Sequence, residues 1–273
     1  VPFLLRCLAL VLVILVLARP QTTNKWQNSE IEGIDIMLAI DVSTSMLAED
    51  LKPNRLEAAK DVAAEFINGR PNDNIGITLF AGETFTQCPL TVDHAVLLDM
   101  IHNIKCGLIT DGTAVGMGIA NAVTRLKDSK AKSKVIILLT DGTNNKGDIS
   151  PMTAAEIAKS FGIRVYTIGV GTNGMAPYPY PVGNTVQYVS MPVEIDEKTL
   201  TEIAGTTDGN YFRATSNSKL KEVYEEIDKL EKTKLNVKEY SKRDEEYHWF
   251  ALAAFLCVLL EVLLRNSVLK KIP

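Results

Sequence analysis

The segment Lys134-Val-Ile-Ile-Leu-Leu-Thr140 contains five consecutive aliphatic residues. A strand that is apolar at every position, and not only at every second one, is typical of a parallel sheet covered on both faces. A similar run, Ile34-Asp-Ile-Met-Leu-Ala-Ile40, lies earlier in the chain, and between the two the residues from Arg55 to Asn68 place their apolar side chains on one helical face. This alternation of apolar runs and amphipathic stretches predicts an α/β fold with a doubly wound, mostly parallel sheet.

The same patterns predict the other elements of this fold. We expect further strands at 74–80, 84–88, 163–170 and 210–213, and helices at 92–104, 114–126, 150–161, 198–204 and 217–230.

One stretch, 172–194, departs from the alternation and contains Pro177-Tyr-Pro-Tyr-Pro181. We expect an inserted loop or an irregular hairpin there. Because it directly follows a parallel strand, it leaves from the carboxyl edge of the sheet, where ligands bind in such folds. Tyr178 and Tyr180 are the large amphipathic side chains that protein interfaces favour, so we interpret the insert as a partner-binding surface. A passive surface loop is the alternative.

The composition excludes several classes of protein. The chain has 273 residues, of which 46% are hydrophobic and 23% are charged, so it can bury a full core. Its formal net charge of −4 gives no indication of nucleic acid as a partner. The four cysteines form no C-x-x-C pair and only three histidines are present, which argues against zinc-finger and iron–sulfur sites.

Two of these cysteines, Cys88 and Cys106, lie inside the predicted α/β domain. They would pair if the domain faced an oxidising compartment. Otherwise they remain as free, mostly buried thiols, which is the state that we expect.

The first eighteen residues are apolar apart from Arg6. They predict a transmembrane helix, with a cleaved signal peptide as the alternative. The chain starts at Val1 without an initiator Met, so we expect that sequence has been lost upstream of this helix.

A second apolar run, 248–264, has close to the ~20 residues that a helix needs to cross a bilayer. Tyr247 and Trp249 at its start are typical interfacial aromatic residues. Basic residues follow its end, namely Arg265, Lys270 and Lys271. Because basic residues are retained in the cytoplasm, the domain before this helix is predicted to face the exterior.

The predicted organisation therefore has an α/β domain between two membrane anchors. Its parts are a transmembrane helix at 1–18, a linker at 19–33, the domain at 34–230 with its insert at 172–194, a juxtamembrane linker at 231–247, a transmembrane helix at 248–264 and a cytoplasmic tail at 265–273.

Oxygen-bearing side chains follow two of the predicted strands. Asp41-Val-Ser43-Thr-Ser45 follows the first strand, Asp141-Gly142 follows the aliphatic strand, and Thr113 precedes a helix. Taken singly, each is typical of a helix cap or a tight turn. Taken together, they are oxygen ligands that converge at one edge of one sheet, which suits a hard divalent cation.

This arrangement resembles the metal-ion-dependent adhesion site, or MIDAS, of von Willebrand factor A domains, which have a Rossmann-like fold. The flanking sequence further resembles the Bat (aerotolerance) membrane proteins of bacteria, of the BatA-like type. The segments that carry this second resemblance include Met46-Leu-Ala-Glu-Asp50, Thr86-Gln-Cys-Pro-Leu-Thr91, Glu194-Ile-Asp-Glu-Lys-Thr-Leu200, Gly209-Asn-Tyr-Phe-Arg213 and Glu261-Val-Leu-Leu-Arg265.

The resemblance implies a Mg²⁺ or Mn²⁺ site in which the hydroxyls of Ser43, Ser45 and Thr113 bind the metal, while Asp41 and Asp141 act directly or through water. A remaining position would accept a carboxylate from a protein partner. The resemblance further implies a protein-binding module without catalytic activity, in the bacterial inner membrane with its A domain facing the periplasm. Its expected partners are related Bat-family proteins and a MoxR-type AAA ATPase, in envelope or oxidative stress tolerance.

Enzymatic alternatives have weaker support in the sequence. Gly169-Val-Gly171-Thr-Asn-Gly174 matches a dinucleotide-binding pattern, but the prolines after it prevent the helix that such a site requires. Ser43 and Ser45 have no histidine in a motif that would make it their base. A metal-dependent phosphoryl-transfer enzyme or phosphatase that uses the same site remains the alternative.

Overall fold

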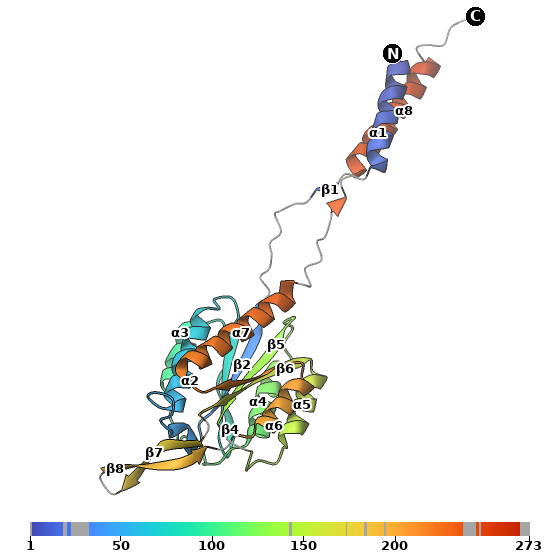
Figure 1. The fold of residues 1–273 in the computed structure, drawn as a ribbon. Helices are drawn as coiled ribbons and strands as arrows, with labels where there is room; N and C mark the ends of the chain where they lie inside the picture. Colours follow the sequence, from blue (N-terminus) through green and yellow to red (C-terminus); the bar gives the residue numbers. More distant parts are fainter. Residues whose placement is uncertain are drawn as a thin grey trace, which may run out of the picture. The chain divides into compact units, whose positions relative to one another are not determined.

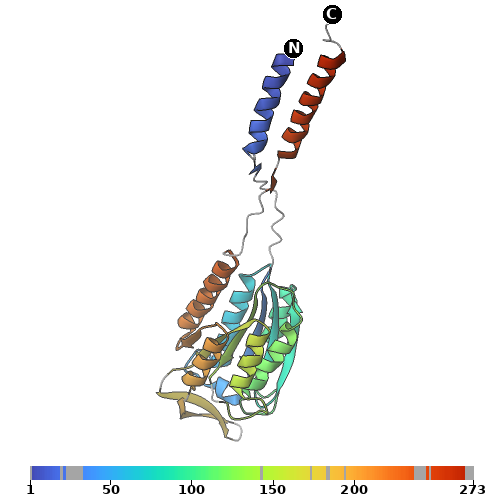
Figure 2. The same cartoon turned by 90° about the vertical axis from the view of Figure 1, so that its right-hand side faces the viewer.

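The computed structural model describes residues 2–18, 21–22, 33–141, 144–172, 174–182, 185–193, 195–236, 244–245 and 247–267. They fall into two compact units, one formed by 31–237 and one by the two ends of the chain, 1–30 and 238–273. The larger unit contains a central sheet with helices on both of its faces (Figures 1 and 2).

The central sheet has six strands in the order β4-β3-β2-β5-β6-β9. Their bounds are Asp35–Asp41 (β2), Asn74–Phe80 (β3), Thr84–Thr91 (β4), Lys134–Thr140 (β5), Ile163–Val170 (β6) and Tyr211–Ala214 (β9). Every neighbouring pair is parallel except β3 and β4. The aliphatic strand β5 lies between β2 and β6, which confirms the predicted α/β sheet and the interior place of this strand.

Alternate residues of each strand face different helix layers. On β2, Ile36, Leu38 and Ile40 belong to one apolar core, whereas Met37 and Ala39 belong to the other. The first core is covered by α2 (Arg55–Asn68), α3 (His94–His102) and α7 (Asn217–Asn236), and the second by α4 (Val115–Leu126), α5 (Pro151–Ser160) and α6 (Glu197–Thr206). Burial on both faces explains why β2 and β5 are apolar without alternation.

The ends of the elements differ most from prediction in two places. The strand expected at 84–88 continues as β4 to Thr91 and pairs antiparallel with β3. The last helix, α7, continues to Asn236, beyond the predicted end at 230.

The insert is a regular two-stranded hairpin, which corrects the expectation of an irregular one. β7 (Gly174–Val182) and β8 (Thr185–Val193) pair antiparallel along their whole lengths. The three prolines of β7 occupy alternate positions, so their missing N–H groups all lie on one side of the strand. Proline is compatible with a strand when that side carries no ladder hydrogen bonds.

The smaller unit contains α1 (Pro2–Leu17) and α8 (Tyr247–Ser267), which lie side by side and antiparallel (Figure 1). Two short strands, β1 (Gln21–Thr22) and β10 (Asp244–Glu245), also pair in this unit. Within the described residues, none of the helices has both the length and the apolar character needed to span a bilayer. Lys270 and Lys271 lie outside those residues.

The cysteines of the larger unit are not paired. Cys88, which is buried on β4, and Cys106, which is half-buried, are free thiols, as expected from the sequence.

A buried carboxylate attaches the end of α7 to the sheet. Glu231 is only 1% exposed and accepts hydrogen bonds from Tyr166 Oη at 2.5 Å, Ser133 Oγ at 2.8 Å and Arg164 Nε at 2.9 Å. Burial alone raises the pKa of Glu231, but the hydrogen bonds from Arg164 and Tyr166 outweigh burial and hold this pKa below its usual value. The ionised carboxylate is therefore the form that stabilises the fold.

We predict that Glu231→Ala lowers the free energy of unfolding of the full chain by about 3 kcal/mol at neutral pH, because Arg164 and Tyr166 lose their acceptor. Urea unfolding of the detergent-solubilised chain measures this. Glu226→Ala, at an exposed position of the same helix, is the control. Because the pKa is lowered in the folded state, the difference between wild type and Glu231→Ala should shrink as the pH falls. An equal loss in both variants would contradict the role of Glu231.

Candidate metal centre

The predicted metal ligands lie at the carboxyl ends of two neighbouring strands. Asp41 is the last residue of β2, and Asp141 directly follows β5. From β2 the chain crosses to β3 on one side, whereas from β5 it crosses to β6 on the other. Adjacent strands whose connections diverge in this way leave a crevice at the carboxyl edge, which is the usual ligand site of open α/β sheets.

Four of the five predicted ligands form one hydrogen-bonded cluster. The Ser43 main-chain N–H donates to Asp41 Oδ1 at 2.9 Å, which turns the chain away from β2. The short 3₁₀ helix η1 (Thr44–Leu47) follows and brings Ser45 Oγ within 3.0 Å of Ser43 Oγ. Ser45 Oγ then donates to Asp141 Oδ1 at 2.7 Å. Both hydroxyls and both carboxylates therefore lie in one place, as the sequence predicted.

Thr113, the fifth predicted ligand, is buried on the loop that leads into α4. Two residues earlier, Asp111 accepts hydrogen bonds from the main-chain N–H of Thr44 at 3.0 Å and from its hydroxyl at 2.9 Å. The Thr113 N–H donates to Asn145 Oδ1 at 2.9 Å. These contacts hold the Thr113 loop against η1. The residue that contacts η1 is Asp111, and not the predicted ligand Thr113.

Sequence analysis missed the guanidinium of Arg55, which is 3% exposed and lies beside the cluster. Arg55 forms an ion pair with Asp141 and a two-bond pair with Asp50, with Nε–Oδ1 at 2.7 Å and Nη2–Oδ2 at 2.8 Å. A signal was present, because Arg55 is the first residue of α2 and a cation there opposes the helix dipole. A positive charge in this position therefore requires nearby carboxylates to compensate it.

The electrostatics of the cluster favour a cation. Burial and the neighbouring Asp141 raise the pKa of Asp41 to about 7. Burial also raises the pKa of Asp141, although the charge of Arg55 opposes this. The carboxylates of Asp50 and Asp141 pair with the single guanidinium of Arg55, and a third carboxylate, that of Asp41, lies beside Asp141. The donor set of hydroxyl and carboxylate oxygens, with excess negative charge, fits a hard divalent cation.

The donor set also differs from that of a typical transition-metal site. Within the described parts of the chain, no group of three or more His, Cys, Asp and Glu side chains is placed to hold a metal. Cys106 lies close to the cluster, with its Sγ 3.4 Å from Ser43 O. Burial and the charges of Asp41 and Asp141 raise the pKa of this thiol to about 12, so it stays protonated at neutral pH.

The hairpin is attached directly beside the cluster. Thr172, which precedes it, donates to Asp50 Oδ2 from its main-chain N–H at 2.7 Å and from its hydroxyl at 3.1 Å. The Glu49 N–H donates to Pro177 O on β7 at 2.9 Å. On β7, Tyr178 is half-buried and Tyr180 is 57% exposed. The insert therefore leaves the sheet at the edge that the sequence predicted.

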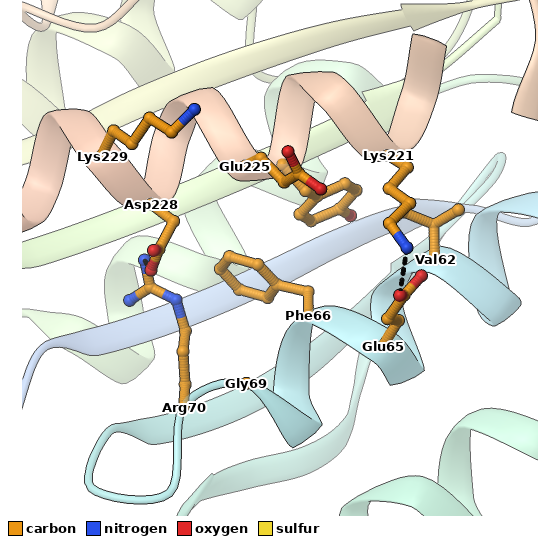
Figure 3. A pocket seen from close by; sticks show the side chains of 10 residues that line it. Val62, Glu65, Phe66, Gly69, Arg70, Lys221, Glu225, Asp228 and Lys229 are labelled. Carbon is orange, nitrogen blue, oxygen red and sulfur yellow. Dashed lines mark hydrogen bonds and ion pairs between the residues drawn. The ribbon is translucent and has the colours of Figure 1, made fainter. Parts of the chain in front are cut away.

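A separate cavity of about 290 Å³ lies between α2 and α7 (Figure 3). The rings of Phe66 and Tyr224 are 4.9 Å apart, and the Arg70 guanidinium lies 4.5 Å from the centre of the Phe66 ring. Arg70 follows the C-terminal end of α2 and precedes β3, so this cavity lies toward the amino ends of the parallel strands. It is therefore not part of the cluster around Asp41 and Asp141.

Comparison with known proteins agrees with this geometry. The model of the von Willebrand factor type A domain matches residues 35–226. A crystal structure of BatB from Bacteroides thetaiotaomicron is 34% identical, with a TM-score of 0.65, and covers 73% of this chain and 100% of its own. An aerotolerance-related membrane protein from Bacteroides fragilis is also 34% identical, with a TM-score of 0.63, over 72% of this chain and 100% of its own.

An uncharacterized protein of Borreliella burgdorferi is 28% identical over 97% of this chain and 78% of its own length. Proximal thread matrix protein 1 of the mussel byssus, solved with a zinc-occupied MIDAS motif, is 25% identical with a TM-score of 0.58, over 72% of this chain and 45% of its own. The family match spans the sheet and all three loops of the cluster. The chain therefore belongs to the von Willebrand factor type A domain family, among the relatives of the Bat aerotolerance-related membrane proteins.

Proposed function

We propose that this chain is a membrane-anchored protein that binds a protein partner through a divalent cation, Mg²⁺ or Mn²⁺. The observation that carries this proposal is the hydrogen-bonded cluster in which Ser43, Ser45 and Asp141 meet beside Asp41. In this proposal the three hydroxyls of Ser43, Ser45 and Thr113 and the two carboxylates hold the cation. The zinc-occupied MIDAS motif of the mussel relative supports it.

The partner supplies a carboxylate that completes the coordination of the cation. Hard cations such as Mg²⁺ accept carboxylate oxygens as ligands. The positive charges of Arg55 and of the bound cation allow the centre to accept the negative charge of one further carboxylate. Beside the cation, Tyr178 and Tyr180 of the hairpin offer the partner an amphipathic contact surface. The attachment of Thr172 and Pro177 to the loop of Asp50 supports a joint surface of centre and hairpin.

The proposed role is binding without catalysis. His94 and His102 both lie on α3, where their ring nitrogens hydrogen-bond the main-chain carbonyls of Asp73 and Leu98. Neither is positioned as a base for Ser43 or Ser45. A metal-dependent phosphatase at the same centre is the competing function.

Membrane anchoring is the second part of the proposal. Apolar side chains of α1 and α8 are widely exposed, including Leu10 at 63%, Phe255 at 63% and Trp249 at 72%. Exposed apolar surface of this kind requires a cover, which a bilayer provides. We propose the bacterial inner membrane, with the A domain in the periplasm. The description of the similar Bacteroides fragilis protein as an aerotolerance-related membrane protein supports a place in a membrane and a role in aerotolerance. We further propose related Bat proteins and a MoxR-type ATPase as partners in stress tolerance.

We predict that Mg²⁺ raises the melting temperature of the full chain in detergent micelles. A cation that binds only the folded state stabilises it by about 2.7 kcal/mol at a hundredfold excess over Kd. Asp41→Asn should abolish the shift, because it removes a charged oxygen from the proposed centre. Asp61→Asn, an exposed carboxylate on α2, should keep the shift. Equal shifts in both variants would show that the cation binds elsewhere.

The same preparations test for catalysis. If wild type releases phosphate from a phosphomonoester in the presence of Mg²⁺ and Asp41→Asn does not, the centre is enzymatic and the binding-only proposal is wrong.

The orientation is predicted from the basic residues after α8. In spheroplasts, added protease should degrade the A domain, and a reporter that is active only in the cytoplasm should stay silent when it is fused after Asn217. Fusion of the same reporter after Pro273 should give full signal. A strong signal from the Asn217 fusion would reverse the proposed orientation.

The contribution of the hairpin is tested by replacing both tyrosines. Tyr178→Ala combined with Tyr180→Ala should weaken capture of the partner from solubilised membranes without changing the Mg²⁺-dependent melting shift. Asp141→Asn should abolish both. If the tyrosine double variant captures as much partner as wild type, the hairpin lies outside the interface.

A further inference from the structure

The two edges of the hairpin differ in their hydrogen-bonding groups. Pro177, Pro179 and Pro181 occupy the positions of β7 whose main chain points away from β8, as the hydrogen bond from Glu49 N–H to Pro177 O demonstrates. Proline has no N–H, so this edge offers no donor at three successive outward positions. It is also partly covered by the Glu49 loop. The outer edge of β7 is therefore closed to a further strand.

The outer edge of β8 is open. Val186, Tyr188 and Ser190 lie opposite the three prolines, so their main-chain N–H and C=O groups also point out of the hairpin. Within the described part of the chain, β7 is the only strand that pairs with β8. Three outward donors and three outward acceptors of one strand therefore remain available for another strand.

The side chains of this edge do not protect it. No residue from 174 to 193 is charged, although 23% of the whole chain is. Natural sheets usually place charged residues or proline on exposed edges to prevent pairing with other chains. Here β7 has three outward prolines, whereas β8 has one, Pro192 near its end, which leaves Val186, Tyr188 and Ser190 unprotected. Apolar side chains of β8 also remain exposed, including Tyr188 at 61%, Val189 at 48% and Met191 at 47%.

We propose that β8 pairs antiparallel with β8 of a second copy of this chain and forms a continuous four-stranded sheet. The two-fold register is centred on Tyr188, which pairs with Tyr188 of the second copy, while Val186 pairs with Ser190 of the second copy. In this register each copy donates three main-chain hydrogen bonds and accepts three. The outward N–H and C=O groups of these residues are then hydrogen-bonded in both copies.

A second copy fits this edge better than a different protein for two reasons. The edge requires an extended, uncharged strand with a free row of N–H and C=O groups at the same spacing, and β8 itself is such a strand. The two-fold axis also places the exposed Tyr188 side chains opposite each other as a cross-strand aromatic pair. An isolated two-stranded hairpin is marginal in water, whereas a four-stranded sheet is not.

Cysteine cross-linking tests the register in the full chain in detergent micelles, with Cys7 and Cys257 replaced by Ser. Tyr188→Cys should give a disulfide-linked dimer under mild oxidation, because directly opposed residues lie within the Cα separation that a disulfide requires. Gln187→Cys should not, since in this register Gln187 pairs with Val189 of the second copy. Equal cross-linking of both variants, or of neither, would overturn the register.

Sedimentation velocity tests the edge itself. Ser190→Pro removes an outward donor and leaves the pairing with β7 intact, so the dimer should be lost, whereas Ser190→Ala should keep it. Circular dichroism checks that both variants fold. Because the pairing uses main-chain groups, EDTA should not dissociate the dimer, which separates this inference from the proposed cation site. A wild-type chain that is monomeric, whether or not its hairpin captures another protein, would overturn the proposal.

Discussion

The burial of two carboxylates at the end of the sheet is the constraint on which the rest of the site depends. Asp41 is fully buried and Asp141 is 2% exposed, at the ends of adjacent strands. Ionised groups in such a place require compensation by opposite charge and by hydrogen bonds. The hydroxyls of Ser43, Ser45 and Thr140 provide hydrogen bonds, and Arg55 provides one positive charge. The negative charge that remains at this edge of the sheet favours a cation.

Arg55 also connects the centre to the hairpin. Its guanidinium bridges Asp141 and Asp50, and Asp50 in turn accepts two hydrogen bonds from Thr172 at the base of β7. Gly171 leaves room for this bridge, since a Cβ there would lie 2.8 Å from the Arg55 guanidinium. The loops that carry Asp50 and Asp141 and the projecting hairpin therefore share one buried ion-pair network, which fixes the orientation of the hairpin base relative to the cluster.

Local patterns were sufficient for most of the fold. The apolar runs of β2, β3, β5 and β6 and the amphipathic pattern of α2 are determined by side chains that alternate or repeat within a few residues, and the predicted bounds agree closely with the structure. The residues Asp41, Ser43, Ser45 and Asp141, taken together with the strand order, were likewise sufficient to predict that these side chains cluster. Both strands of the cluster end in the same crevice because parallel strands share a carboxyl edge.

Other features depend on contacts between residues far apart in the chain. The partnership of Arg55 with Asp141 joins elements separated by 86 residues, and that of Glu231 with Arg164 by 67, so no local pattern contains them. The prolines of the insert suggested irregular structure by themselves. Only the register with β8 shows that all three face outward, where proline does not interrupt a sheet. The amino-acid sequence thus determined the strands, the helices and the oxygen-bearing side chains of the cluster. The tertiary structure decided which charges compensate the carboxylates and which edge of the hairpin stays open, because both depend on pairing across the fold.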